Sequence, residues 1–410
     1  MLQLKERDTQ TKVKHEILQE YLKHWGYIIT NGLNYTYKAA RDPHSLATRF
    51  VYVDCFSFMG AYAPENDEPV YGSPIIGIDG LDKLANNFKE RNGVTPETYA
   101  ILVEEDNNNF QVLLDTLNQC GYQNRVKLTL DLNELRPGEI AVINDDSRNH
   151  FEKLLNFTKR PYTWSFYFLD PYGPKGIPFD IVSRIVSQDK TDTIINLPYQ
   201  DLHKKTGSAA KETPHPSHIP LLGYYDAMYG GKLWREIAQR YDRGEIDTED
   251  LEHELVELYR NVLHEYDNEI ALKRIPLKFP AHERTMFYLF LTTHDGTGAL
   301  KMNEILDDAK ISEYDHRQKA KSERTQQISM FDQLIEDPSR PQETAYSVDD
   351  IADTIYQLCK GETITYKTVL ARLADTPYYL EQIKKGMSKL KRTQKCSYKD
   401  LSHKELITFV

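Results

Sequence analysis

The stretch RFVYVDCFSFMG, residues 49–60, decides the fold class. It begins with a short run of apolar and β-branched residues between polar ones, so we expect a buried strand that ends at Asp54. A turn follows and reaches Gly60. A buried strand that delivers an acid and then a turn is typical of the first strand of an α/β sheet that binds a nucleotide cofactor.

Four further segments have the character of buried strands, and helical patterns lie between them. They are Tyr99–Glu104, Arg125–Asp131, Ser165–Asp170 and Thr193–Leu197. Strands that alternate with helices predict right-handed βαβ units and a parallel sheet covered on both faces. Ligands of such sheets bind at the carboxyl ends of the strands. The sequence places acids at four of those ends, namely Asp54, Glu104, Asp131 and Asp170.

A cofactor such as S-adenosylmethionine (SAM) or a dinucleotide needs a tight turn after the first strand and an acid after the second strand to bind the ribose hydroxyls. The candidates for these roles are Asp54, Phe56, Gly60 and Glu104. Phe58 stands where a small residue is expected, and a larger side chain keeps the backbone farther from a ligand.

The next helix is expected to start in YGSPIIGIDGLDKL, with Ser73 as its N-cap and Pro74 as its first residue. The N–H groups at this helix start are candidates to face the carboxylate of the cofactor. Simple helix initiation is the alternative interpretation.

Asp170 is followed directly by Pro171, Tyr172 and Gly173. Methylation of an exocyclic amine needs an acceptor that orients the N–H groups and a ring that stacks on the base. Asp170 and Tyr172 are the candidates for these two roles. The alternative is a strand followed by a Pro-Tyr-Gly turn, with Asp170 as a cap.

The remaining segments suggest a division of the chain into several parts. Residues 1–48 contain a packing helix, whose apolar face lies within Lys12–Ile29 and precedes a turn at Asn31-Gly32. Residues 49–308 form the α/β domain with a helical insertion at about 202–280, in which 202–231 is expected to be an irregular loop. Residues 309–343 are a polar linker. Residues 344–410 have the pattern of a winged-helix-like α+β module, with helices at Ser347–Cys359, Tyr366–Ala374 and Tyr379–Thr393.

Two short segments suggest binding to other macromolecules. The last of these helices carries a basic cluster that is a candidate for phosphate contacts, although a solvated helix face is the alternative. Its residues are Lys384, Lys385, Lys389, Lys391 and Arg392. Within the linker, the peptide Gln327, Ile328, Ser329, Met330, Phe331 resembles the motif by which bacterial replication proteins engage the sliding clamp. The alternative is a segment that packs on its own domain.

Composition limits the functional classes. A net charge of −11 argues against a protein that coats nucleic acid with its whole surface. No apolar run is long enough to span a membrane and no signal-peptide core is present, so we expect a cytoplasmic protein. Cys55, Cys120, Cys359 and Cys396 are interpreted as ordinary thiols. No metal is expected, since nothing in the sequence makes His203, His215 or His218 a ligand.

Six motifs together resemble the three-Cys-motif partner protein family, a bacterial group with a methyltransferase-like core. They are KHEILQEYLKHW at 14–25, YVDCFSFMGAYAP at 52–64, GSPIIGI at 72–78, LVEED at 102–106, LDPYG at 169–173 and YLFLTTHDGTG at 288–298. The resemblance implies a Rossmann-like class I methyltransferase sheet and SAM as cofactor. It also implies a partner with three cysteines that resembles radical-SAM enzymes, and a role in phage defence or on a mobile element.

By this resemblance, Asp54 and Gly60 would flank SAM and Glu104 would bind its ribose. Asp131 and Asn133 would lie near the adenine, and Asp170 and Tyr172 near the methyl acceptor. We therefore expect a SAM-dependent methyltransferase that acts on nucleic acid or a nucleotide-like group. Relatives tend to carry glycine at the position of Phe58. The alternative is a non-catalytic adaptor that has lost SAM and brings its partner to DNA.

Overall fold

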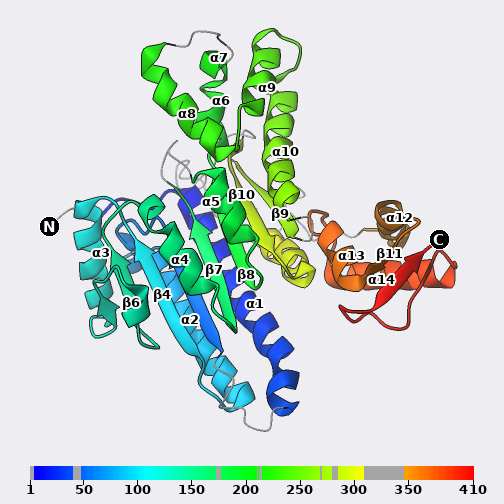
Figure 1. Ribbon diagram of the computed structural model, residues 1–410, viewed down its shortest axis with the longest axis horizontal. Coiled ribbons are helices and arrows are strands. Elements are labelled where there is room, and N and C mark those ends of the chain that lie inside the picture. Colours follow the sequence, from blue (N-terminus) through cyan, green and yellow to red (C-terminus); the bar gives the residue numbers. More distant parts are fainter. Residues whose placement is uncertain are drawn as a thin grey trace, which may run out of the picture.

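The computed structural model describes residues 4–39, 48–171, 177–209, 211, 215–267, 270–278, 285–308 and 346–410 (Figure 1). Its centre is an eight-stranded sheet in the order β5-β6-β4-β1-β7-β8-β10-β9. The first six of these strands run parallel, and β10 runs antiparallel to both of its neighbours. The predicted fold class, an α/β fold with a Rossmann-like, mostly parallel sheet, is confirmed.

The strands of this sheet match the sequence patterns closely, with three exceptions, one of which is the strand at 271–278, where the helical insertion was expected to continue to about 280. In chain order they are β1 Arg49–Asp54, β4 Glu97–Val103, β5 Val126–Lys127, β6 Ile140–Ile143, β7 Thr163–Leu169, β8 Thr191–Leu197, β9 Ala271–Lys278 and β10 Thr285–Thr293. The predicted strand Arg125–Asp131 shrinks to the two residues of β5, and β6 takes the place beside β4. The apolar residues Leu128 and Leu130 alternate with polar residues, as in a strand with one buried face. These two residues are 64% and 51% exposed, so this segment has no buried face.

Both faces of the sheet are buried. Along β1, Val51 and Val53 belong to the core on one face, and Phe50 and Tyr52 belong to the core on the other. Each of these four side chains has no exposed surface, which explains why the strand is an unbroken apolar run.

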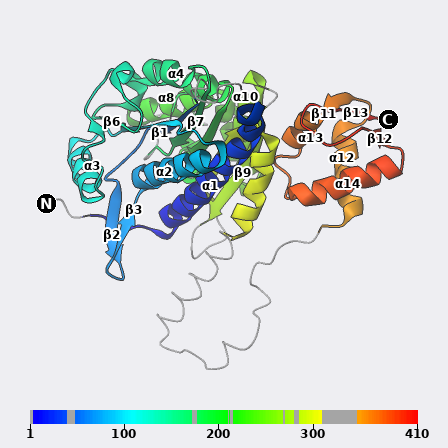
Figure 2. The ribbon, with the colours of Figure 1, turned by 90° about the horizontal axis from the view of Figure 1, so that it is seen from below.

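Helices from different parts of the chain cover the two faces. Figure 2 shows α1 and α2 side by side under the sheet. The first face is covered by α1 Thr9–Ala39, α2 Ser73–Asn92 and α3 Asn107–Gln119, together with a helix described over 296–308. The second is covered by α4 Phe151–Thr158 and α5 Phe179–Val186. A hairpin of β2 Ala61–Glu65 and β3 Glu68–Tyr71 precedes α2.

The N-terminal helix is longer than predicted, because the turn expected at Asn31-Gly32 is helical and α1 continues to Ala39. Ile29 and Leu33 pack against the core beneath the sheet. Tertiary packing of this apolar stripe therefore overrides the low helix propensity of the Asn-Gly pair.

The segment expected to be an irregular loop at 202–231 contains helices, which corrects that prediction. With the helices that follow, it forms a lobe above the sheet (Figure 1). The elements are α6 Tyr199–His203, α7 Thr206–Ala209, a 3₁₀ turn at Pro216–His218, α8 Ile219–Met228, α9 Leu233–Asp242 and α10 Thr248–Tyr266. Pro216 and Pro220 lie in the first turns of their helices, where a missing N–H breaks no hydrogen bond.

The C-terminal residues form a separate cluster of helices and a small antiparallel sheet (Figure 2). The elements are α12 Val348–Cys359, β11 Thr363–Thr365, α13 Tyr366–Arg372, α14 Leu380–Arg392, β12 Cys396–Ser397 and β13 Leu406–Phe409, with strand order β11-β13-β12. The three predicted helices are present, and the winged-helix assignment stays a prediction. This C-terminal module docks on the edge strand β9, where Asp375 accepts a hydrogen bond from Arg274 Nε at 2.6 Å.

Within the described part of the chain, no helix is long and apolar enough to cross a membrane. All four cysteines are free thiols.

Candidate functional site

Three acids meet at the carboxyl edge of the sheet. They are Asp54, at the end of β1, Glu104, directly after β4, and Asp170, directly after β7. In the sheet register Asp54 pairs with Leu102 and with Phe168, so Glu104 and Asp170 each extend two residues beyond it. Because β1 lies between β4 and β7, Asp54 forms the floor of the site and the other two acids flank it.

Asp54 is fully buried. Its Oδ1 accepts a hydrogen bond from the backbone N–H of Phe56 at 3.1 Å, and its Oδ2 lies 3.4 Å from the hydroxyl of Tyr52. Burial raises the pKa of Asp54 to about 7, against which the hydrogen bonds from Ser73 and Phe56 act. No ion pair to Asp54 exists among the described residues. The negative charge of the Asp54 carboxylate is therefore poorly compensated. A ligand with a cationic or N–H group would stabilise this charged form.

The turn after β1 is fixed by Glu104. Phe58 has a φ of 51°, in the left-handed region that disfavours side chains, and Gly60 has a φ of 69°. The N–H of Phe58 donates to Glu104 Oε2 at 2.7 Å, and this charge-assisted bond offsets the conformational cost of about 1–2 kcal/mol. The structure therefore places Phe58 where glycine would be unstrained, and joins this turn to the end of β4.

Glu104 also fixes the start of α3. Its Oε1 accepts hydrogen bonds from the backbone N–H of Asp106 at 2.9 Å and from the side-chain amide of Asn109 at 3.3 Å. The side chain is 8% exposed, and burial raises its pKa against the effect of these bonds. The carboxylate is thus held in one orientation at the edge where a ribose is expected.

Asp170 is held by two residues that the sequence analysis did not single out. Lys14 Nζ, from α1, lies 2.5 Å from its Oδ2, and the side-chain amide of Asn196, at the end of β8, donates to its Oδ1 at 2.7 Å. The side-chain oxygen of Asn196 is buried and has no hydrogen-bond partner among the described residues. The site thus contains an ion pair between residues 156 positions apart and a free acceptor beside it.

Ser73 does not act as the predicted N-cap. Gly72 is the N-cap of α2 and Ser73 is its first residue, and among the described residues no side chain caps this helix. The hydroxyl of Ser73 instead contributes a hydrogen bond to the carboxyl of Asp54. The Ser73 hydroxyl therefore binds the buried carboxyl of Asp54 and does not cap the helix. This hydrogen bond holds the start of α2 next to Asp54.

Asn133 lies away from the edge that carries Glu104, and the hydrogen bonds of Asp131 are local ones. Asp131 caps a short 3₁₀ turn at Leu132–Glu134. Asn133 accepts a hydrogen bond from Arg160, which precedes β7 and therefore lies toward the amino ends of the strands. The residue that reaches the end of β4 from the neighbouring strand is Asn144, whose amide donates to the Glu104 carbonyl at 2.9 Å. Asn144 follows β6, which the sequence patterns did not identify.

Of the remaining predicted site residues outside α14, Phe56 is described and the others are not. Phe56 is half-buried and packs against the core beside Asp54. Tyr172 and the whole peptide Gln327, Ile328, Met330 and Phe331 lie outside the described residues.

The predicted basic cluster on α14 is partly neutralised. Lys389 is paired with Asp349, and Lys384 lies 2.6 Å from Glu381. Lys391 stacks over the ring of Tyr398 at 4.3 Å. Lys385 and Arg392 are exposed on the face of α14 that points away from the core of the C-terminal module.

Comparisons with known proteins show only distant likenesses. No family model matches the chain, and no curated protein matches it. Among solved structures, a DUF519 protein of Legionella pneumophila shares 11% identity over 68% of this chain and 85% of its own, with a TM-score of 0.29. A loganic acid methyltransferase solved with S-adenosylhomocysteine (SAH) shares 12% identity over 71% of this chain and 98% of its own, with a TM-score of 0.24.

Proposed function

We propose that this protein is a SAM-dependent methyltransferase that acts on an amino group of a nucleic acid or a nucleotide-like molecule. The observation that carries the proposal is the convergence of three acids at the carboxyl ends of three adjacent parallel strands, at the edge where α/β sheets bind their ligands.

The residues at this edge fit SAM. The cofactor has ribose hydroxyls and carries positive charge on its sulfonium and amino groups. Glu104 is oriented as an acceptor for the hydroxyls. Asp54 is a buried acid without a counter-ion in the described structure, so it favours a positively charged ligand. When bound, SAM supplies an electrophilic methyl group.

The acceptor amine would lie against Asp170 and Asn196. An amino group has two N–H donors, and the carboxylate of Asp170 and the unpartnered oxygen of Asn196 are two acceptors on adjacent strands. The nitrogen would take the methyl group as the sulfur–carbon bond of SAM breaks and SAH leaves, and the proton of the nitrogen would pass to the carboxylate of Asp170. Tyr172 would stack on the base that carries the amine.

Titration of the full chain with SAM by calorimetry tests the cofactor assignment. Glu104→Gln keeps the shape of the side chain and removes its charge, so we expect SAM binding to weaken about tenfold or more. Glu97→Gln is the matched control, because Glu97 begins the same strand at the opposite edge and is paired with Arg49 at 2.7 Å. The proposal fails if SAM releases no heat at high micromolar concentration, or if both variants bind it equally well.

The second candidate function is a non-catalytic adaptor that brings its partner to DNA. Two observations favour it: Lys14 lies on Asp170, at the expected position of the acceptor, and Phe58 occupies the strained turn. A double variant, Lys385→Glu with Arg392→Glu, should weaken DNA binding of the full chain and lessen its salt dependence. Lys360→Glu with Lys395→Glu provides a charge-matched control on the same C-terminal module. Equal DNA affinity of both variants would show that Lys385 and Arg392 of α14 do not bind DNA.

The proposed partners are a three-cysteine radical-SAM-like protein and, through residues 327–331, the bacterial sliding clamp. Co-purification of each candidate with the full chain and with a Met330→Ala, Phe331→Ala variant tests both. Loss of the clamp alone in the variant is the expected result.

A further inference from the structure

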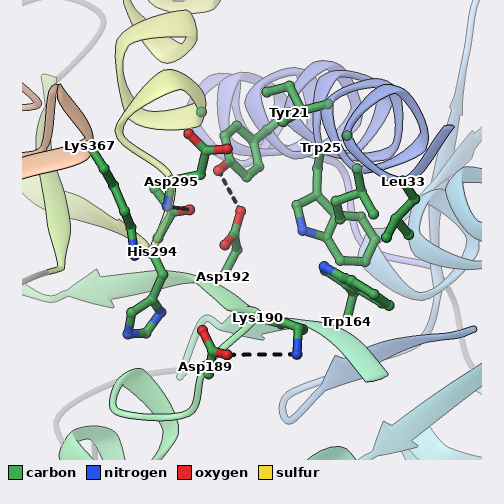
Figure 3. A pocket seen from close by; sticks show the side chains of 15 residues that line it. Tyr21, Trp25, Leu33, Trp164, Asp189, Lys190, Asp192, His294, Asp295 and Lys367 are labelled. Atoms are coloured by element: carbon green, nitrogen blue, oxygen red, sulfur yellow. Dashed lines mark hydrogen bonds and ion pairs between the residues drawn. The ribbon is translucent and has the colours of Figure 1, made fainter. Parts of the chain in front are cut away.

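A cavity of about 280 Å³ lies at the amino end of the sheet, opposite the three acids of the candidate site (Figure 3). It is lined by α1, by the first residues of β7 and β8, by the end of β10 and by Lys367 of the C-terminal module. This volume is near the lower limit for small-molecule sites, which are commonly about 300–1,000 Å³. The cavity is therefore suited to a compact ligand.

One side of the cavity holds a buried acid, Asp192. Its side chain is 8% exposed, and its Oδ2 accepts a hydrogen bond from the hydroxyl of Tyr21 at 2.8 Å (Figure 3). Burial raises the pKa of Asp192 to about 6, although hydrogen bonds from Thr293 and Tyr21 oppose the shift. Among the described residues no cation forms an ion pair with it. A buried acid that faces a cavity without a counter-ion favours a ligand that brings positive charge or N–H donors.

The opposite side is aromatic and apolar. Figure 3 shows the indoles of Trp25 and Trp164 with Leu33 beside them, and all three side chains line the cavity. Trp25 is only 4% exposed, and the ammonium of Lys190 lies 5.4 Å from the ring centroid of Trp164, so the part of Trp164 that Lys190 leaves open is the main stacking surface. A ring stacked on an aromatic side chain contributes about 1–3 kcal/mol to binding.

A further polar atom is free at the rim. The Nε2 atom of His294 lies 3.0 Å from Asp267, and its Nδ1 is buried with no hydrogen-bond partner among the described residues. The cavity thus offers acceptors and an aromatic surface in one compact space.

We propose that this cavity binds a planar nitrogen heterocycle of nucleobase size that carries an amino group, with its N–H donors directed at Asp192 and its ring against Trp164. The proposal does not depend on the methyltransferase function, because the two sites lie at opposite ends of the sheet. It adds a second ligand site, in contact with the C-terminal module through Lys367.

The fluorescence of tryptophan in the full-length protein provides a direct test, since two of the three tryptophans line the cavity. Adenosine and cytidine are the probes. Purine riboside and pyrimidin-2-one riboside, which lack the amino group, are their matched controls. We expect at least one amino nucleoside to change the emission in a saturable way, and its control to bind at least about tenfold more weakly.

Variants distinguish this site from the proposed cofactor site. Asp192→Asn should weaken binding about tenfold or more, and Leu33→Phe should block the cavity without changing the acid. Lys23→Met, at an exposed position of α1, should leave binding unchanged, and Glu104→Gln reports any adenosine that binds at the cofactor site. The proposal is overturned if neither nucleoside binds, if the amino group makes no difference, or if binding survives in Leu33→Phe. Adenosine binding that depends on Glu104 and not on Asp192 would assign the signal to the cofactor site.

Discussion

Both ends of the central sheet hold acids with little exposed surface, and these acids differ in how their negative charge is compensated. At the carboxyl end, Asp170 is paired with Lys14 at 2.5 Å and is also bonded by Asn196. At the amino end, Asp192 receives hydrogen bonds from Tyr21 and Thr293 and has no ion pair in the described structure. Asp54, beside Asp170, resembles Asp192 in this respect. A paired acid is a fixed acceptor, whereas an unpaired buried acid keeps a raised pKa until a ligand compensates it.

The largest expected effect comes from breaking the pair at the carboxyl end. Lys14→Met should lower the free energy of unfolding by about 3 kcal/mol, because it leaves a largely buried carboxylate without its cation. Chemical denaturation at pH 7.5 measures the loss. Adding Asp170→Asn in the same chain should recover most of it, and Lys23→Met, an exposed lysine of the same helix, is the control. Equal stability of Lys14→Met and wild type would mean that the pair is not formed.

The next effect concerns pH. The folded-state pKa of Asp54 is raised from 3.8 to about 7, so the native state holds this proton more tightly than the unfolded chain. Its contribution to stability is therefore lost as pH rises from about 4 to about 7. In the wild-type protein, Asp54 should lower the free energy of unfolding by roughly 2–3 kcal/mol between pH 5 and pH 8. The Asp54→Asn variant should not show this part of the decline.

Asp192→Asn sharpens this comparison. The pKa of Asp192 is raised to about 6. The loss of unfolding free energy that Asp192 causes as pH rises should therefore end about one pH unit below the loss that Asp54 causes. Denaturation curves at several pH values measure both windows. Identical pH profiles for the two variants and wild type would contradict the raised pKa values.

A smaller effect is expected at Tyr21. Tyr21→Phe removes a donor to the buried carboxylate of Asp192 and should cost about 1–2 kcal/mol at pH 7.5. The cost should shrink at pH 5, where Asp192 is mostly protonated. Tyr27→Phe, at a 56% exposed position of the same helix, is the control. An undiminished cost at pH 5 would argue that the hydroxyl does not act through the ionised carboxylate.

The smallest effect separates backbone strain from packing at Phe58. Phe58→Ala and Phe58→Gly both remove the ring, but only glycine is unstrained at a φ of 51°. We expect the glycine variant to be more stable than the alanine variant by about 1 kcal/mol in thermal or chemical unfolding. The reverse order would contradict the left-handed conformation of this turn.

Prediction from sequence succeeded where a local pattern carries the information. The strands β1, β4, β7 and β8 are short apolar runs, and such runs fold in the same way wherever both faces are covered. The acids Asp54, Glu104 and Asp170 were found because each ends such a run. The run through Leu128 and Leu130 misled, since alternation does not reveal whether a face is buried.

The partners of the acids could not be predicted in this way. Lys14 is one of many lysines on a helical pattern, and it reaches Asp170 because α1 crosses beneath the sheet to its carboxyl edge. Ser73 looked like an N-cap, but the neighbouring buried carboxyl of Asp54 takes its hydroxyl. Such choices depend on which groups are desolvated together, and residues distant in the sequence decide them.

The sequence by itself determined the α/β fold, the strands at its centre and the three acids at their carboxyl ends, because hydrophobic periodicity and strand ends are local properties. Tertiary structure alone decided which acids have counter-ions. It paired Asp170 with Lys14, buried Asp54 and Asp192 with no paired cation among the described residues, and formed the cavity between α1 and the amino ends of β7 and β8. The reason is physical: the ionisation of a buried group depends on its distance to charges and to water, and folding alone fixes both.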